Sequence, residues 1–299
     1  KPFYFHGVDI TPNKKQSKGT CPFCDKENHF QVSTSTGQWS CLRCGEGQGK
    51  GNGGNIPGFI QKIHTYSIEN TTDDDLAEIT EDRGISVHTL REWGVCLSFI
   101  TGEILIPMYN SKGKLSNLTR AFKADGKWKA YSTPGMGNHP FRNPKVNKRQ
   151  KTAWIAEGIW DGLRMVDTLK SLKQKGNRLV KCSPSAPGCL YETQTVIAVP
   201  GANVFKEEWA DYLSGKDTYL IYDNDHAKKQ PITKKTYYPG YDGMERVKGI
   251  LSESNNPPRS LHLIRWGGKR KADASLADGY DIRDLFNEQG NLKGYKRIT

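Results

Sequence analysis

The sequence predicts an α/β protein with a mainly parallel sheet and flanking helices, preceded by an antiparallel subdomain and, at the N-terminal end, a small zinc-binding module. Three observations support this prediction. After Thr152, apolar strands alternate with helical stretches; between 102 and 122 two strand-like segments flank a short turn; and two Cys-x-x-Cys pairs lie within the first 44 residues. Alternation of strands and helices is typical of parallel sheets, because parallel strands need long crossover connections.

Composition narrows the range of functions. The 299 residues contain 44 Lys and Arg against 32 Asp and Glu, a formal net charge of +12, which favours a polyanionic partner and above all nucleic acid. No apolar run approaches the roughly twenty residues that a bilayer requires, and no signal-peptide pattern opens the chain. We therefore expect a cytoplasmic protein with no membrane partner.

The strongest local signal is the pairing of four cysteines. Cys21 and Cys24 form one knuckle, Cys41 and Cys44 form the other, and sixteen residues separate the two. Four thiolates in this arrangement hold Zn²⁺ tetrahedrally and leave no open position, so the zinc is predicted to be structural. The total of seven cysteines is odd, which favours a metal site in a reducing compartment over a disulfide framework.

Residues 1–63 are predicted to form this metal-stabilised module, because they contain too few large apolar side chains for a core of their own. Segments 29–32 and 38–40 are typical of the strands of a zinc ribbon. We expect Phe30 and Val32 to form its small core. The side chains that remain open for base contacts are His29, Trp39 and Arg43.

The polar segment 64–75 is predicted to be a linker, because such stretches cannot bury enough apolar surface to order themselves. From 76 to 150 we expect an N-terminal subdomain. Its predicted elements are two short helices within 76–94, the second capped by Ser86, and antiparallel strands over 102–108 and 113–122.

Residues 151–299 are predicted to form the parallel-sheet unit. We expect strands at 153–156, 195–199, 218–222 and 260–265, with helices at 159–172, 204–213 and 243–251. An insertion rich in lysine, residues 226–242, delays the last of these helices. Its Lys228, Lys229, Lys234, Lys235 and Asp242 line a substrate channel or decorate a surface loop, and the sequence leaves this choice open.

Acidic residues follow two of the predicted strands. Glu157 and Asp161 follow the first, and Asp223 and Asp225 end the third. Ligands in parallel sheets bind at the carboxyl ends of strands, and carboxylate oxygens suit Mg²⁺ or Mn²⁺. Asp281, beyond the last strand, could add another carboxylate.

The segments Glu157-Gly-Ile-Trp-Asp161 and Asp223-Asn-Asp225 resemble the two signature motifs of the TOPRIM fold, found in bacterial-type primases, topoisomerases and some nucleases. The primase part of phage and mitochondrial-type primase-helicases is the most similar, because the knuckles followed by residues 54–60 resemble its zinc ribbon and trailing helix. The resemblance implies a template-recognition ribbon over 1–63 and an RNA polymerase domain over 76–299 that contains the TOPRIM unit.

The resemblance also implies residue roles. Glu157 would act near the 3′-hydroxyl as metal ligand or base, with Asp161 as the second acid of its motif. Asp223 and Asp225 would hold catalytic Mg²⁺ or Mn²⁺, with Asp281 as an accessory ligand. Arg120 and Lys129 match positions that face template or nucleotide phosphates.

The activity implied is that of a DNA primase, which joins ribonucleoside triphosphates into short RNA primers on single-stranded DNA. The sequence has no G-x-x-x-x-G-K-[ST] motif, so a replicative helicase is expected as a partner on a separate chain or segment. Two alternatives use the same motifs: a TOPRIM nuclease or topoisomerase, and a non-catalytic zinc and TOPRIM recombination mediator that binds DNA.

Overall fold

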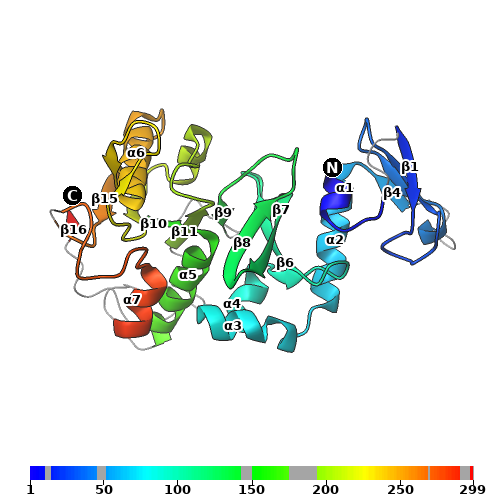
Figure 1. The fold of residues 1–299 in the computed structure, drawn as a ribbon, viewed down its shortest axis with the longest axis horizontal. Coiled ribbons are helices and arrows are strands. Elements are labelled where there is room, and N and C mark those ends of the chain that lie inside the picture. Colours follow the sequence, from blue (N-terminus) through cyan, green and yellow to red (C-terminus); the bar gives the residue numbers. More distant parts are fainter. Residues whose placement is uncertain are drawn as a thin grey trace. The chain divides into compact units, whose positions relative to one another are not determined.

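The computed structural model describes residues 1–10, 15–45, 52–142, 150–174, 194–268, 270–289 and 297–298. The chain divides into two compact units (Figure 1). The N-terminal unit comprises residues 1–77 and 90–139, and the C-terminal unit comprises residues 78–89 and 140–299. No helix among the described residues is both long and apolar enough to span a bilayer.

The N-terminal unit begins with a short helix, α1 (Pro2–Phe5), followed by a four-stranded antiparallel sheet whose strands neighbour one another in chain order. Its strands are β1 (Gln16–Gly19), β2 (Phe30–Ser33), β3 (Trp39–Cys41) and β4 (Asn52–Gly54), and a 3₁₀ turn, η1 (Arg43–Gly45), follows β3. The two predicted ribbon strands correspond to β2 and β3. The sheet and the four cysteines beside it fit a zinc ribbon.

Helix α2 (Ile56–Asn70) occupies more than half of the segment that the sequence predicts as a linker. Its start is set by Asn55, whose Oδ1 accepts a hydrogen bond from Gly58 N at 3.0 Å. The side chains of Phe59, Ile60, Ile63, His64 and Ser67 are buried, so one face of the helix is in the core. The linker prediction is wrong for 64–70, because His64 and Ser67 are buried in the core while Thr65, Glu69 and Asn70 lie on the exposed face of an amphipathic helix.

A second antiparallel sheet completes the N-terminal unit. Its strands, again in chain order, are β5 (Cys96–Leu97), β6 (Ile104–Tyr109), β7 (Leu115–Ala124) and β8 (Lys127–Ser132). The two predicted strands match β6 and β7. Helix α2 packs on β5 and β7, and Cys96, Leu105 and Leu118 share a core with the ribbon. The ribbon is therefore not an isolated module.

The short helices predicted within 76–94 are α3 (Ala77–Arg83), which follows a 3₁₀ turn, η2 (Asp74–Leu76), and α4 (Val87–Glu92). The predicted cap of the second helix is present, because Thr89 N donates to Ser86 Oγ at 3.3 Å.

The C-terminal unit is built on a six-stranded sheet in the order β16, β15, β12, β10, β11, β9. The four central strands are parallel: β10 (Thr152–Glu157), β11 (Gln194–Val199), β12 (Asp217–Ile221) and β15 (Ser260–Ile264). Two short edge strands, β9 (Phe141–Arg142) and β16 (Arg297–Ile298), are antiparallel to their neighbours. The prediction of a mainly parallel sheet is confirmed.

Helical segments cover both faces of this sheet. Helix α5 (Ile159–Gln174) packs on β10, β11 and α7 (Ile282–Gln289). The opposite face forms a core with Phe205, with Trp209 of the 3₁₀ segment η3 (Glu207–Tyr212), and with Met244 and Val247 of α6 (Pro239–Glu253). The helix predicted over 204–213 is thus the shorter η3. The delayed start of α6 matches the prediction, and the insertion before it forms a hairpin of β13 (Lys228–Lys229) and β14 (Thr236–Tyr237).

Candidate active site and nucleic-acid interface

The strand order of the parallel sheet creates one crevice suited to a ligand. From β10 the chain crosses to β11 on one side and then to β12 on the other side of β10. In open parallel sheets, ligands bind outside the carboxyl ends of the strands where the strand order reverses. Glu157 ends β10, and Asp223 and Asp225 follow β12. The predicted acids therefore lie at this switch point.

The turn from β10 into α5 depends on Gly158. Its φ is +92°, a backbone conformation that favours glycine, and a Cβ there would come within 2.8 Å of Asp161 Oδ2 and push that carboxylate aside. Gly158 N donates to Val199 O at 2.8 Å, which ties the turn to the end of β11. This geometry turns Asp161, in the first turn of α5, back toward the strand end that carries Glu157.

Glu157 is held by backbone amides, because hydrogen bonds from the amides of Ala202 and Asp223 both act to lower its pKa. Its Oε1 accepts a hydrogen bond from Ala202 N at 3.1 Å, in the loop after β11. Its Oε2 is buried and has no hydrogen-bond partner. A buried carboxylate oxygen without a hydrogen-bond donor is expected to accept a hydrogen bond from a ligand or a water molecule, or to coordinate a cation.

Asp225 is held by the two ends of the insertion. Its Oδ1 accepts from Lys228 Nζ at 2.8 Å, and its Oδ2 accepts from Gly240 N at 2.9 Å in the first turn of α6. Gly240 also lies against Asp223, because a Cβ on Gly240 would be 2.2 Å from Asp223 O. Only glycine permits this approach.

Asn224, between the two aspartates, connects them to Asp281. Its Nδ2 donates to Asp273 O and Ala277 O at 3.0 and 3.1 Å, its Oδ1 accepts from Asp273 N at 2.8 Å, and it forms an isolated bridge with Tyr280. Asn224 therefore fixes the loop that leads into α7. A lone asparagine between two aspartates carries no sequence signal for contact with a distant loop, so this role is visible only in the structure.

Asp281 caps helix α7. Its Oδ1 accepts from Arg283 N at 2.7 Å and Asp284 N at 3.0 Å, and its Oδ2 pairs with Arg283 Nη2 at 3.1 Å. Both of its oxygens therefore have partners within the chain. Asp281 therefore holds the N-terminal end of α7 in place, and this structural role is independent of any role in binding a metal.

The electrostatics of the crevice bring these acids together. Burial is the largest cause that raises the pKa of Glu157 to about 7, and the charge of Asp225 adds to it. Burial, followed by the charges of Asp161, Glu157 and Asp281, raises the pKa of Asp223 to about 10. Burial and the charge of Asp281 also raise the pKa of Asp161. Such mutual repulsion of carboxylates is expected where a cation normally balances them.

These residues fit an open magnesium or manganese site. All the candidate ligands are carboxylates, the donor type that hard divalent cations prefer, and Glu157 Oε2 has no partner. Within the described part of the chain, only the four cysteines bring three or more ligand atoms within 4.8 Å of one another. The carboxylates are thus not closed around one point, and a cation held by them would take further ligands from water or substrate oxygens, as is usual for Mg²⁺.

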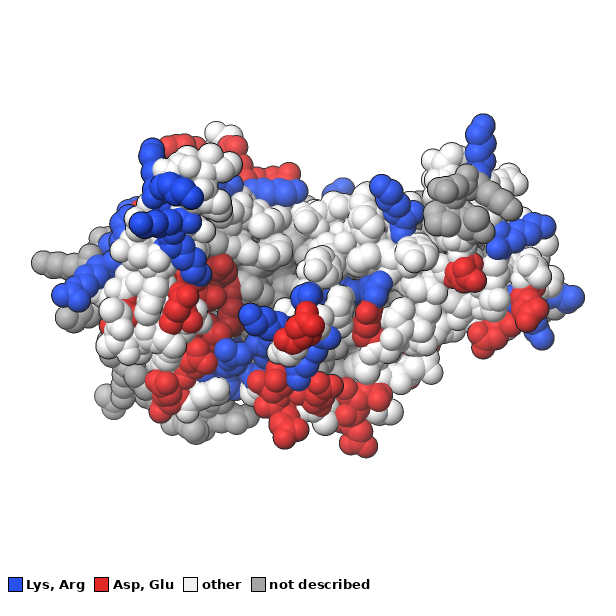
Figure 2. Space-filling model, in the orientation of Figure 1, with Lys and Arg blue, Asp and Glu red and all other residues white. Residues whose placement is uncertain are grey.

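Cationic side chains surround this crevice. Figure 2 shows acidic and basic side chains side by side over the unit that contains α5, α6 and α7. Arg83 and Arg283 act on the charge of Asp161, and Lys228 pairs with Asp225. The two arginines were not singled out from the sequence, because an Arg beside Asp in a chain with 44 basic residues is not distinctive.

The four cysteines form the second candidate metal centre. Their sulfur atoms all lie within 4.8 Å of one another, and two pairs, Cys21 with Cys44 and Cys24 with Cys41, are 3.4 and 3.8 Å apart. Tetrahedral Zn–S bonds of about 2.3 Å require sulfur separations of about 3.8 Å. Burial raises the pKa of the Cys21 thiol, and it raises that of Cys44 to about 11, so a metal is needed to hold these thiolates at neutral pH. The cluster fits structural zinc.

Trp39 belongs to the core of the ribbon. It is 5% exposed, stacks on Phe30 at 5.5 Å between ring centroids, and donates from Nε1 to Asn55 O at 3.1 Å. Phe30 and Val32 are buried beside it, as predicted. Its stacking face is therefore occupied by the protein. His29 is half-buried and Arg43 is exposed.

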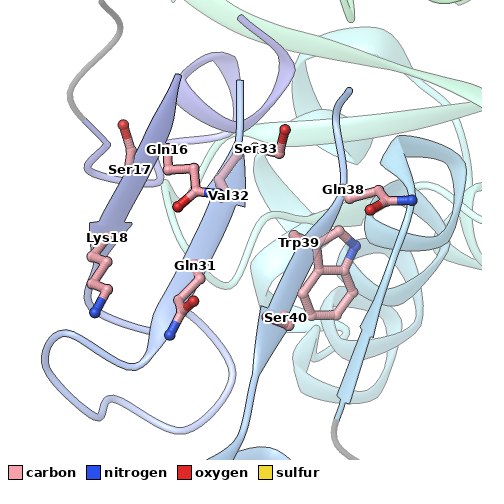
Figure 3. Close-up of a pocket in the computed structure, with 9 residues that line it drawn as sticks. All are labelled: Gln16, Ser17, Lys18, Gln31, Val32, Ser33, Gln38, Trp39 and Ser40. Carbon is pink, nitrogen blue, oxygen red and sulfur yellow. The ribbon is translucent and has the colours of Figure 1, made fainter. Parts of the chain in front are cut away.

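The opposite face of the ribbon carries polar side chains from three strands (Figure 3). Lys18, Gln31 and Ser40 lie across β1, β2 and β3 in direct register, and Gln16 pairs with Ser33 in the next row. Together with Gln38 they line a hollow of about 240 Å³. These positions were not among the predicted base-contacting residues, although the alternation of Phe30, Gln31, Val32 and Ser33 along β2 indicates that Gln31 and Ser33 share the face opposite the core.

Arg120 and Lys129 lie on one face of the second sheet of the N-terminal unit. On β7 and β8, Arg120 is paired with Tyr131 and Phe122 with Lys129, so all four side chains share a face. Tyr131 is 53% exposed. Arg120 forms an ion pair with Glu103 and lies over the ring of Phe5, and Lys129 is 3.7 Å from Asp125. The face combines cations with an exposed aromatic ring, a combination found where proteins bind nucleic acid.

Comparison with solved structures identifies the fold. The catalytic core of DnaG aligns with 78% of this chain and 76% of its own length, with a TM-score of 0.51 at 12% identity. The chain has the fold of a primase catalytic core. The Escherichia coli primase catalytic core aligns with a TM-score of 0.48 at 11% identity, over 78% of this chain and 76% of that one.

The primase fragment of the bacteriophage T7 primase-helicase aligns over 91% of this chain and 94% of that one, with a TM-score of 0.39 at 13% identity. Neither a protein-family model nor a curated protein matches the sequence. The primase-core fold agrees with the mainly parallel sheet of the C-terminal unit. The assignment of the site residues is based on the geometry of this chain.

Proposed function

We propose that this protein is a DNA primase that synthesises short RNA primers from ribonucleoside triphosphates on single-stranded DNA. The observation that carries the proposal is the set of carboxylates Glu157, Asp161, Asp223 and Asp225 at the switch point of a sheet with the primase-core fold. The fold alone does not assign an activity, but these acids supply the chemistry that nucleotidyl transfer needs.

Each side chain has a stated task in this proposal. Glu157, Asp223 and Asp225 hold Mg²⁺ or Mn²⁺, which when bound lowers the pKa of the attacking 3′-hydroxyl and neutralises charge on the departing pyrophosphate. Glu157 Oε2, which has no partner in the chain, can instead take the 3′-hydroxyl proton. Asp161 adds negative charge next to Asp223, and Asp281 fixes α7 as its cap and serves as an accessory acid.

Template recognition is assigned to the zinc ribbon within residues 1–63. Its outer face presents amide, hydroxyl and ammonium groups from Gln16, Lys18, Gln31 and Ser40, which can donate to and accept from base edges. Trp39, although only 5% exposed, also lines the hollow on this face. His29 and Arg43 lie at accessible positions and extend the proposed contacts, while Arg120 and Lys129 position the phosphates of template or nucleotide.

We further propose that the protein acts in the cytoplasm with a replicative helicase supplied by another chain or segment. There are two alternative activities. Nuclease or topoisomerase chemistry would use the same acids, whereas DNA binding without catalysis would use none of them. They differ in product, because only a primase makes new oligoribonucleotides.

The test is synthesis by the zinc-loaded full chain with four ribonucleotides, Mg²⁺ and single-stranded DNA. Asp223→Asn keeps the shape and removes a charge, so primer synthesis is expected to fall by at least about 100-fold while single-strand binding stays unchanged. Asp211→Asn, a change at an exposed aspartate of η3, is the matched control and is expected to retain full synthesis.

The template positions at which these RNA products begin show whether synthesis starts at preferred sequences, as expected if the ribbon recognises the template. Equal losses of DNA binding and synthesis in Asp223→Asn would indicate a structural role for Asp223. Cleavage of the DNA without any oligoribonucleotide product would favour the nuclease alternative instead.

A further inference from the structure

The hairpin between β12 and α6 is attached to the candidate active site at both of its ends. At the start of the hairpin, Lys228 Nζ lies 2.8 Å from Asp225 Oδ1. After its end, Gly240 N donates to Asp225 Oδ2 at 2.9 Å. Asp225 thus joins the two ends of an insertion whose purpose the sequence left undecided.

The position of Lys228 is fixed by backbone pairing. Lys228 pairs with Tyr237 and Lys229 with Thr236 in the two-stranded β13 and β14 ribbon. Successive residues of a strand point to opposite sides, so Lys228 is directed toward Asp225 and Lys229 is directed away from it. A second carboxylate, Asp278, lies 3.9 Å from the Lys228 ammonium and holds it on the same side.

This ammonium occupies a carboxylate oxygen that a divalent cation at the candidate site would also use. Asp225 has two oxygens, of which Oδ2 accepts from a backbone amide and Oδ1 from Lys228. The side chain of Lys228 is 43% exposed, whereas that of Asp225 is 14% exposed, so the lysine covers the acid and is itself reachable from solvent. Two cations at one carboxylate repel each other, so the lysine must move or the metal binds weakly.

We propose that Lys228 is a resident counter-ion of Asp225 which the triphosphate of the incoming nucleotide draws away, so that nucleotide binding opens Asp225 to the divalent cation. In this exchange the Lys228 ammonium would leave Asp225 Oδ1 for a phosphate oxygen, and Asp225 Oδ1 would become available to hold the divalent cation. Lys228 is a positioning residue that couples the two ligands. The inference rests on the proposed function, because it requires the crevice to bind metal and nucleotide.

The first test measures metal alone. The zinc-loaded full chain is titrated with Mn²⁺ in the absence of nucleotide, and free Mn²⁺ is followed by electron paramagnetic resonance. Lys228→Met is expected to bind Mn²⁺ roughly tenfold more tightly than the unchanged protein, because a competing charge is gone. Lys228→Arg, which keeps the charge, and Lys229→Met, the matched neighbour on the same strand, are expected to match the unchanged protein.

The second test measures nucleotide alone. Binding of a fluorescent ATP analogue without divalent metal is expected to weaken severalfold in Lys228→Met and to stay unchanged in Lys229→Met. An Mn²⁺ affinity of Lys228→Met equal to that of Lys229→Met would overturn the inference, as would an unchanged affinity for the analogue.

Asp225→Asn separates this inference from the proposed function. If Asp225→Asn loses Mn²⁺ binding but Lys228→Met does not gain it, the metal site stands and the role of Lys228 fails. If neither the unchanged protein nor any variant binds Mn²⁺ beyond what the zinc ribbon retains, both the metal site and the inference fail.

Discussion

Replacing Gly240 by alanine tests whether the insertion and α6 position the candidate metal ligands. A Cβ at this residue would be 2.2 Å from Asp223 O, a backbone atom that has no freedom to rotate away. Carbon and oxygen need roughly 3.3 Å, so the first turn of α6 must move about 1 Å from the strand end. The same movement stretches the 2.9 Å hydrogen bond from Gly240 N to Asp225 Oδ2.

The magnitude follows from these two contacts. Overpacking against a fixed neighbour costs about 1–3 kcal/mol, and a lost hydrogen bond to a charged acceptor costs about 1.5–3 kcal/mol. Replacing glycine by alanine within a helix stabilises the folded state by up to about 1 kcal/mol, which partly offsets these losses. We expect Gly240→Ala to lower the free energy of unfolding of the C-terminal unit by about 2–4 kcal/mol, and to reduce primer synthesis because Asp223 and Asp225 move apart.

The same helix provides a control. A Cβ on Gly249 would meet no atom within 4 Å, so Gly249→Ala is expected to stabilise the protein by about 0.5–1 kcal/mol. The assay is urea unfolding followed by far-ultraviolet circular dichroism, with amide exchange in α6 to assign the transition. If Gly240→Ala is as stable as Gly249→Ala, the tight approach of α6 to Asp223 does not exist in solution and the argument from this contact is refuted.

Two further predictions concern the N-terminal unit. Cys41→Ser, or removal of zinc by a chelator, is expected to abolish amide-exchange protection in β1–β4. Protection in α2 is expected to fall as well, because Phe59 and Ile60 share the core of the ribbon. If β2 and β3 stay protected without zinc, the zinc is not structural. His6, 1% exposed and 3.0 Å from Thr133 Oγ1, has its pKa lowered to about 3 by burial and by Arg120. Because the unfolded state binds this proton near pH 6.5 and the folded state does not, stability is complete above pH 6.5 and declines as the pH falls toward 3, by at most about 1.4 kcal/mol per pH unit. In His6→Gln the decline between pH 6 and 4.5, measured by urea unfolding, is expected to be shallower, and an unchanged slope would mean that His6 is protonated in the folded protein.

The sequence by itself determined the elements whose signals are local. Apolar runs bounded by turns predicted β10, β11, β12 and β15, and the pairing of Cys21 with Cys24 and of Cys41 with Cys44 predicted the zinc cluster. The two acidic motifs predicted which residues would stand at the strand ends. Each of these inferences uses residues that are close along the chain, where spacing translates directly into geometry.

The tertiary structure decided what depends on distant contacts. Residues 64–70 are too polar to predict order, yet they are helical because His64 and Ser67 are buried against the turns at Gly94 and Phe99, which flank β5. The sequence predicts that Trp39 is available for base contacts, but Phe30 and Phe59 pack on its ring and leave it 5% exposed. The pairing of Lys228 with Asp225 depends on how the hairpin folds back between β12 and α6. Burial and charge pairing depend on which residues lie nearby in space, and these residues can be far away along the chain. For a long polar or aromatic side chain, these spatial neighbours decide whether its role is structural or functional.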